Sequence, residues 1–304
     1  EAERDLGMDD YVHQGFLEAL EAVNTIVPGQ RVHATGYCLG GTLLAIAAAA
    51  MERDGDERLA SLSLFTAQTD FSEPGELALF IDESQLNLLQ AQMAERGFLD
   101  SSQMAGAFTW LRSCDLLWQR MVQEYLLGER SRGMDLMAWN ADSTRMPARM
   151  HTEYLSQMFL HNDLARGRYL VGGHPVVLND LKIPVYAVGT ESDHVAPWKS
   201  VYKIHLLTDT EVTFVLTKGG HNAGIVSEPG RPRRHYRIAT RPAYGSYKTA
   251  DSWVQDAEMH QGSWWENWHA WLDKNSGAPQ ATPAMGSKDY PALEDAPGLY
   301  VMER

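Results

Sequence analysis

The chain is poor in cysteine, in positive charge and in long apolar runs, and each shortage excludes a class of protein. Two cysteines in 304 residues give no disulfide framework, so a reducing cytoplasm is the expected compartment. Lysine and arginine number 26 against 40 aspartates and glutamates, and the net charge of −14 argues against a nucleic-acid partner. The longest apolar run, Thr42 to Met51, is too short to span a bilayer.

A five-residue motif, Gly36-Tyr37-Cys38-Leu39-Gly40, joins a short strand-like run to an alanine-rich helical run. This is the pattern of a nucleophile elbow, a strained strand-to-helix turn that exposes its central side chain. We expect both flanking glycines to be needed, because a Cβ at either position would clash with the turn. The start of the following helix favours a Cys38 thiolate, and the N–H of Leu39 is a predicted oxyanion donor. The other interpretation is a buried cysteine beside two turn glycines.

Strand-like and helix-like segments alternate around this motif, which predicts a βαβ unit and a parallel sheet. The expected elements are a helix at 9–27, the nucleophile strand at 31–37, a helix at 41–51 and a second strand at 59–67. Such sheets carry their sites at the carboxyl ends of the strands. The predicted fold is α/β, an α/β-hydrolase fold with flanking helices. Because that sheet normally has strands before the nucleophile strand, we expect those to be missing, and the sequence to be a C-terminal piece or a processed form.

Two later strands predict the partners of Cys38. A buried strand at 183–189 is followed by Asp193, and an alternating strand at 211–217 is followed by His221. The chain order of nucleophile, acid and histidine is that of α/β-hydrolases. We therefore predict a triad of Cys38, His221 and Asp193, with Asp70 as a weaker alternative for the acid. His194 either lines the pocket or caps the next helix.

The stretch between residues 72 and 180 is dominated by helical patterns rich in large apolar residues, and its position predicts a cap over the site. Cys114 lies among apolar residues there and is interpreted as a buried structural thiol. No grouping of histidine, cysteine and carboxylates has metal-ligand spacing, so no metal is expected. We divide the chain into a first core part (1–72), a helical cap (73–180), a second core part (181–275) and an extended tail (276–304).

Further motifs accompany the elbow. They are GTESDHVAPW at 189–198, GGHNAGIV at 219–226, GSWWENWHAWL at 262–272 and APGLYV at 296–301. With these motifs the chain resembles the class I polyhydroxyalkanoate synthases over nearly its whole length.

The resemblance implies an acyltransferase that polymerises (R)-3-hydroxyacyl-CoA into a growing polyester chain and releases CoA, without a cofactor. It implies that Cys38 becomes acylated, that His221 activates it, and that Asp193 supports the histidine or activates the incoming hydroxyl. Trp139, in a Trp-Asn-Ala-Asp run, is expected to line the substrate pocket. The resemblance also implies a cytoplasmic homodimer associated with the surface of polyhydroxyalkanoate granules.

One segment departs from the acidic character of the chain. Pro229 to Ala250 contains Arg233, Arg234 and four other basic residues, and no acidic residue. Arginine binds phosphates through paired hydrogen bonds, and the segment follows the His221 loop. We therefore expect Arg233 and Arg234 to bind the CoA phosphates, with a solvated basic loop as the alternative.

Two other functions remain open. The first is a cysteine-dependent hydrolase of the dienelactone hydrolase type, which has the same elbow without a large helical insertion. The second is an inactive truncated remnant.

Overall fold

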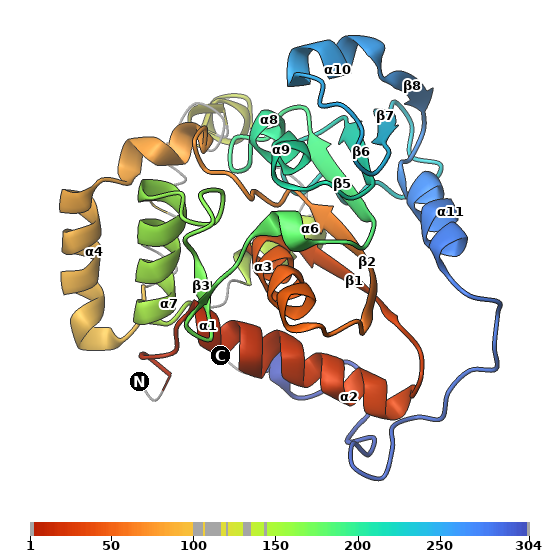
Figure 1. The fold of residues 1–304 in the computed structure, drawn as a ribbon. Coiled ribbons are helices and arrows are strands. Elements are labelled where there is room, and N and C mark those ends of the chain that lie inside the picture. Colours follow the sequence, from red (N-terminus) through yellow and green to blue (C-terminus); the bar gives the residue numbers. More distant parts are fainter. Residues whose placement is uncertain are drawn as a thin grey trace.

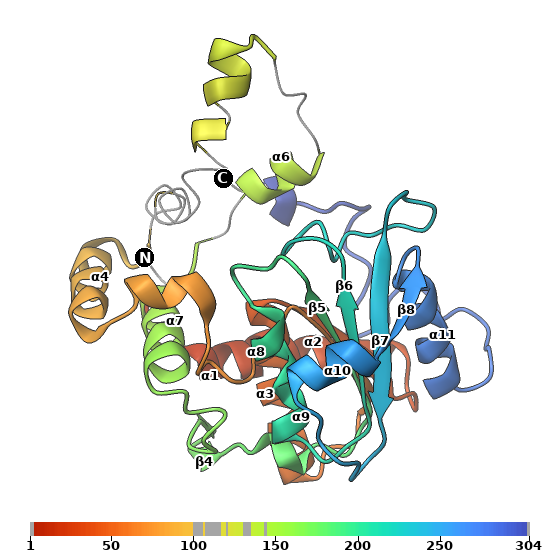
Figure 2. The ribbon, with the colours of Figure 1, turned by 90° about the horizontal axis from the view of Figure 1, so that it is seen from above.

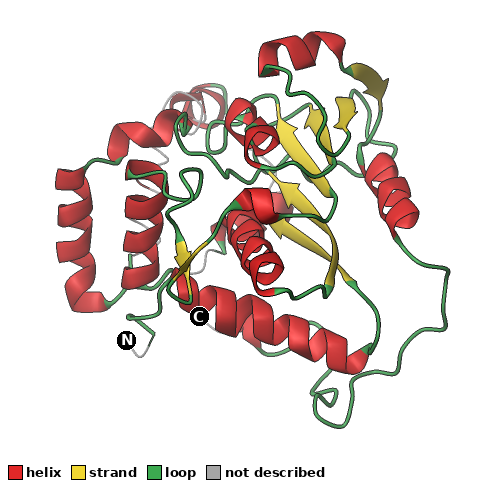
Figure 3. Ribbon diagram, in the orientation of Figure 1, coloured by secondary structure: helices red, strands yellow, loops and turns green. Residues whose placement is uncertain are grey.

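The computed structural model describes residues 3–99, 106, 117–119, 121–129, 135–142 and 145–302. Its centre is a six-stranded sheet in the order β1-β2-β5-β6-β7-β8 (Figures 1 and 3). The strands are β1 (Val32–Tyr37), β2 (Leu59–Phe65), β5 (Val185–Thr190), β6 (Val212–Thr217), β7 (His235–Arg241) and β8 (Glu258–Gln261). The first three pairings are parallel and the last two antiparallel. The prediction of a mainly parallel α/β sheet is confirmed.

The register of the sheet aligns the ends of the parallel strands. Tyr37 pairs with Phe65, Phe65 with Val188, and Thr190 with Thr217. Because parallel strands end at one edge, the loops after β1, β5 and β6 leave the sheet side by side. The residues expected to act chemically all lie on these three loops.

Helices cover both faces of the sheet, because alternate strand residues point to opposite sides. One face packs against α3 (Leu39–Asp54), α8 (Trp198–Tyr202), α9 (Ile204–Leu207) and α10 (Ala250–Asp256). On the other face Tyr186, Val188 and Val215 pack against tryptophans of α11 (Trp265–Asn275) and its N-cap Trp264. Figure 2 shows α11 on the side of the sheet opposite α3 and α8.

The expected first helix is present as three continuous segments. They are α1 (Met8–Asp10), a π-helical η1 (Tyr11–Leu17) and α2 (Glu18–Ile26). Met8, Val12 and Leu20 are buried in the core that α3 shares. This helical layer supports α3 from outside and thereby the turn that carries Cys38.

The region between β2 and β5 is helical in most of its described residues. It contains η2 (Gly75–Phe80), α4 (Glu83–Arg96), η4 (Met121–Leu126), α6 (Asp135–Ala141), α7 (Ala148–Glu153), η5 (Tyr154–Leu160) and η6 (Leu178–Asp180). A small antiparallel hairpin, β3 (Leu170–Val171) with β4 (His174–Pro175), interrupts it. Cys114 lies outside the described residues. The division into core, cap and tail stays a prediction.

The C-terminal third contains two strands that the sequence did not reveal. The segment interpreted as a basic loop includes β7, which pairs antiparallel with β6 and with β8. After α11 the chain runs extended and largely exposed to a short 3-10 turn, η7 (Tyr300–Met302). Among the described residues, no helix is both long and apolar enough to cross a membrane.

Candidate active site

Cys38 occupies a strained turn between β1 and α3. Its backbone has φ 53° and ψ −127°, a conformation that residues with a side chain rarely adopt. The Cys38 N–H donates to the carbonyl of Phe65 at 2.9 Å, and the Cys38 carbonyl accepts from the N–H groups of Gly41 and Thr42. The strained residue is thus held on one side by β2 and on the other by the first turn of α3.

The glycines around Cys38 are needed at different positions from those we expected. A Cβ on Gly36 would lie 2.5 Å from the Cα of Gly41, so Gly36 is required as predicted. Gly40 faces open space, and the prediction for that position is wrong. The second crowded residue is Gly41, where a Cβ would lie 2.5 Å from that of Ala67. The closest approach is therefore between Gly36 of β1 and Gly41, the third residue of α3.

Asp193 and His221 lie together. The Nδ1 atom of His221 is 2.8 Å from Oδ2 of Asp193, whose side chain is fully buried. The same carboxylate accepts a hydrogen bond from the hydroxyl of Thr190 at 3.1 Å and from the backbone N–H groups of Val195 and Ala196. These bonds satisfy the buried carboxylate and fix its direction toward the imidazole.

The surroundings of His221 stabilise its charged form. Burial alone would lower the pKa of this histidine, but hydrogen bonds to Asp193 and Cys38, together with their negative charges, raise that pKa to about 9. Because Nδ1 faces Asp193, Nε2 is the ring nitrogen available to the thiol. The arrangement therefore places a charged imidazolium beside the Cys38 sulfur at neutral pH.

Asp70, the alternative acid, has other partners. Its carboxylate accepts from the backbone N–H and hydroxyl of Ser72 and from the side-chain amide of Asn162. The amide of Asn162 also accepts from the N–H of Phe71. Asp70 therefore connects the loop after β2 to the end of η5, and the structure pairs His221 with Asp193.

Two residues that the sequence analysis missed hold the His221 loop against β1. The hydroxyl of Tyr37 donates to the side-chain oxygen of Asn222 and lies 3.4 Å from the carbonyl of His221. The rings of Tyr37 and His221 are 5.2 Å apart. Burial and the nearby charges of Cys38 and Asp193 raise the pKa of Tyr37, so its hydroxyl stays protonated and remains a donor. The residue before the nucleophile is thereby bonded to the residue after the histidine.

An aromatic cluster joins the loop after β2 to η5. The ring of Phe71 is 4.8 Å from that of Phe159 and 6.1 Å from that of Tyr154. Burial, with a smaller contribution from the charge of Cys38, raises the pKa of Tyr154, so its phenol stays protonated. The cluster packs the loop after β2 against η5.

Three other predicted residues have different settings. Leu39 is the first residue of α3, so its N–H has no acceptor within the helix and directly follows the nucleophile. The ring of His194 is half exposed and lies 3.7 Å from the carboxylate of Glu76. The cap of α8 is Pro197 and not His194, so the capping alternative is wrong. Trp139 lies on α6 and is 55% exposed.

The two arginines expected to bind CoA differ from each other. Arg234 donates to the carbonyls of Lys218 and Ala223, both at 2.9 Å, and so braces the two sides of the His221 loop. Arg233 is exposed and adopts a left-handed backbone conformation with φ 60°. Of these two arginines, Arg233 is the exposed one. No cluster of histidine, cysteine and carboxylates suited to a metal ion occurs among the described residues.

Comparison with known families agrees with this geometry. Residues 2–228 match the family model of the alpha/beta hydrolase fold, and the chain belongs to that family.

Among its relatives, the chain is 41% identical to the "Poly(3-hydroxyalkanoate) polymerase subunit PhaC" of Rhizobium etli, 39% to the "Poly(3-hydroxyalkanoate) polymerase" of Methylorubrum extorquens and 34% to the PhaC subunit of Cupriavidus necator. The alignments cover 97%, 99% and 96% of this chain, and 46%, 49% and 50% of those proteins. The predicted resemblance to polyhydroxyalkanoate synthases is confirmed. The chain spans about half the length of these curated relatives.

The raised pKa of His221 leads to a testable pH dependence. In a Cys114→Ala background, Cys38 should react with iodoacetamide at pH 6 up to about a hundredfold faster than a free thiol, whose pKa is about 8.5. By linkage, the stabilisation from the charged imidazole is present in full at pH 6 and is lost as the pH rises through about 9. Replacing Asp193 with Asn lowers the pKa of His221 and should slow alkylation at pH 6 roughly tenfold. Mass spectrometry across pH 5–10 measures both rates, and identical pH profiles would contradict the ion pair.

The Tyr37 contact predicts a separable effect on the site. Tyr37→Phe keeps the ring and removes the hydroxyl bonded to Asn222, so the His221 loop loses one anchor. Its matched control is Tyr186→Phe, which removes a hydroxyl bonded to Asn267 at 2.9 Å on the α11 face. Each change should reduce the free energy of unfolding by about 1 kcal/mol. Only Tyr37→Phe should slow alkylation of Cys38 at pH 6, by several-fold, and an equal loss in both variants would exclude a positioning role.

Proposed function

We propose that this chain carries the catalytic part of a polyhydroxyalkanoate polymerase, an acyltransferase that joins (R)-3-hydroxyacyl groups from CoA thioesters. The observation that carries the proposal is a cysteine in the elbow, facing a buried His221–Asp193 pair, in a chain 41% identical to a named polymerase subunit. The same elbow with serine serves ester hydrolysis in this fold. A thiol in that position suits transfer between thioesters.

The proposed reaction starts with the Cys38 thiolate attacking the thioester carbonyl of the acyl-CoA. The carbonyl oxygen becomes an oxyanion, which the N–H of Leu39 stabilises. The carbon–sulfur bond to CoA breaks, and the departing thiolate takes the proton of the His221 imidazolium. The product is an acyl thioester on Cys38 with neutral His221 beside it.

Elongation uses the neutral imidazole as a base. A 3-hydroxyl group approaches the Cys38 thioester, His221 takes its proton, and the oxygen attacks the carbonyl carbon. The bond to the Cys38 sulfur breaks, the thiolate is restored beside imidazolium, and a new oxoester has formed. Asp193 orients the imidazole and stabilises its charge in both steps. Exchange of one thioester for another is nearly neutral in energy, and oxoester formation then drives the reaction forward.

Water is the competing acceptor for the acyl group. In this proposal the packed rings of Phe71, Tyr154 and Phe159, which join the loop after β2 to η5, help to exclude water from the thioester. In this proposal the helical segment 73–180 acts as the cap, and His194 and Trp139 contribute to the substrate pocket. A hydrolase of the dienelactone type would instead admit water to the same intermediate.

Incubation with 3-hydroxybutyryl-CoA distinguishes the proposed functions. A polymerase releases CoA and forms insoluble polyester, a hydrolase releases CoA and free 3-hydroxybutyrate, and an inactive remnant releases neither. Polyester in the reaction supports the proposal, and free acid or no release overturns it.

The proposed localisation is the surface of a polyester granule in the cytoplasm, with the chain acting as a homodimer. Support comes from exposed large apolar side chains in the described part of residues 117–139. They are Leu117, Trp118, Met121, Val122, Tyr125, Leu126, Leu127, Met137 and Trp139. Such a gathering of apolar side chains on a surface is typical of an interaction site.

The nucleophile is tested by substitution of each cysteine. Cys38→Ala should abolish covalent acylation, Cys38→Ser should acylate slowly because a hydroxyl is a much weaker nucleophile, and Cys114→Ala should retain most acylation. Intact-protein mass spectrometry after exposure to the acyl-CoA measures the adduct. An acyl group on Cys114, or on neither cysteine, would contradict the proposed mechanism.

The proposed site for the CoA phosphates centres on Arg233. The carbonyl of His235 accepts from the N–H of Lys218, directly after β6, so Arg233 lies at the same edge of the sheet as His221. Arg234 belongs to the framework of the loop, and its replacement would disturb His221 directly. Arg233 is therefore the residue to change.

Arg233→Ala should lower kcat/KM for the acyl-CoA roughly tenfold, because a charge-assisted hydrogen bond contributes about 1.5–3 kcal/mol. An N-acetylcysteamine thioester lacks the phosphates and should be used as before. Lys182→Ala is the control, since it removes an exposed positive charge ahead of β5, at the opposite end of the sheet. Equal losses with both thioesters would assign Arg233 a structural role.

A further inference from the structure

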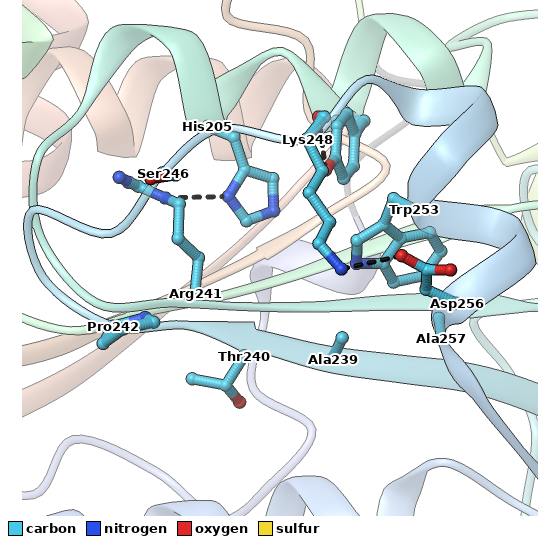
Figure 4. A pocket seen from close by; sticks show the side chains of 11 residues that line it. His205, Ala239, Thr240, Arg241, Pro242, Ser246, Lys248, Trp253, Asp256 and Ala257 are labelled. Carbon is cyan, nitrogen blue, oxygen red and sulfur yellow. Dashed lines mark hydrogen bonds and ion pairs between the residues drawn. The ribbon is translucent and has the colours of Figure 1, made fainter.

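A cavity lies at the end of the sheet opposite Cys38. Its walls come from β7, α9, α10 and the segment before α10 (Figure 4), and its volume is about 210 Å³. That corresponds to roughly seven water molecules at about 30 Å³ each. Arg241 in its lining pairs with Val212, the first residue of β6, whereas the His221 loop follows the last residue of that strand. The cavity is therefore separate from the candidate active site.

His205 presents an unpaired N–H donor to this cavity. It is 4% exposed, and its Nδ1 lies 3.2 Å from Nε of Arg241. Because a guanidinium only donates, Nδ1 must be the acceptor, and the neutral ring carries its proton on Nε2. Burial and the charge of Arg241 lower the pKa of His205 to about 3, which keeps the ring neutral. Nε2 has no hydrogen-bond partner among the described residues, and Figure 4 shows it facing the space beside Lys248.

A buried donor without an acceptor is costly, so this position calls for an acceptor atom from outside the chain. The other walls supply an apolar surface, mainly from Trp253, Tyr202 and Ala239. They indicate a ligand with an apolar body rather than a purely polar one.

The charges around the cavity favour an anion. Three of the four remaining N–H donors of Arg241 bind the carbonyls of Thr208, Thr210 and Gly245, and its positive charge remains. Lys248 is 57% exposed and lies 2.7 Å from the carboxylate of Asp256. The lining itself therefore carries two cations and one carboxylate, and the charge of Asp209, which is not part of the lining, acts on Arg241 from outside it.

We propose that this cavity binds a small organic carboxylate with a compact apolar body. One carboxylate oxygen accepts from Nε2–H of His205, the ammonium of Lys248 pairs with the charge, and the apolar body packs against Trp253 and Ala239. Asp256 competes for Lys248 and sets an upper limit on the affinity. The proposal is independent of the function proposed for Cys38.

The test compares benzoate and butyrate with their neutral amides, benzamide and butyramide. Binding is measured by isothermal titration calorimetry, and by fluorine NMR with 4-fluorobenzoate as the probe. The carboxylates should bind at one site and the amides at least tenfold more weakly, because the amides lack the charge. His205→Asn should weaken carboxylate binding at least tenfold. The asparagine oxygen takes the place of Nδ1 as acceptor for Arg241, so the framework bond is kept while the Nε2 donor is lost.

Lys248→Met should also weaken binding at least tenfold. Its matched control is Lys199→Met, which breaks a similar exposed ion pair, with Asp251 at 2.6 Å, outside the cavity lining. Asp256→Asn should tighten binding because it frees Lys248. If His205→Asn fails to fold, Ala239→Met, which fills the cavity, should abolish binding instead.

Several results would overturn the proposal. The first is the absence of binding by either carboxylate at concentrations up to about 10 mM. The second is equal affinity for the amides and the carboxylates. The third is an affinity for the carboxylates that is unchanged in Lys248→Met and also unchanged in His205→Asn, where that variant folds, or in Ala239→Met. In each case the cavity would be a water-filled gap in which His205 serves only to hold Arg241.

Discussion

The closeness of β1 and α3 is the constraint on which the candidate site depends. A side chain at Gly36 would collide with the backbone of Gly41, and one at Gly41 would collide with Ala67. Because neither position has a Cβ, the strand and the helix lie close enough for the single residue Cys38 to connect them. Cys38 adopts the strained backbone conformation that this short connection requires. A single added methyl group would push α3 away from the sheet. The thiol would then move relative to His221, whose position depends on a different strand.

The sheet register supplies the second half of that geometry. Cys38, Asp193 and His221 follow three different strands, and only the paired ends of β1, β2, β5 and β6 bring those loops together. The buried carboxylate is held by the backbone of its own loop, through Val195 and Ala196. The imidazole loop is held separately, through Asn222 on the Tyr37 hydroxyl. Acid and base are therefore positioned by independent contacts that meet at one hydrogen bond.

The sequence predicted those parts of the structure that depend on local pattern. The elbow motif, the buried strands of the parallel sheet and the order of Cys38, Asp193 and His221 are all legible in short runs of residues. Contacts between residues far apart in the chain cannot be recognised in such short runs. The hydrogen bond between Tyr37 and Asn222 is an example, because 185 positions separate the two residues. Residues 229–250 were predicted to be a loop because of their basic composition, so β7 was not predicted. Composition also does not distinguish Arg234, which donates to backbone carbonyls, from Arg233, which is exposed. Gly40 and Gly41 were confused because a motif records which residues recur and not which atoms collide.

The contrast between His221 and His205 shows why environment decides the chemistry of a side chain. Burial lowers the pKa of both His221 and His205. At His221 the anionic partners Asp193 and Cys38 outweigh burial and raise the pKa to about 9, whereas the cation Arg241 adds to burial at His205 and lowers the pKa to about 3. At neutral pH one ring is therefore charged and lies beside the Cys38 sulfur, and the other is a neutral ring with a single free N–H. The same residue type is thus charged at one end of β6, beside the Cys38 sulfur, and neutral at the other end, beside Arg241.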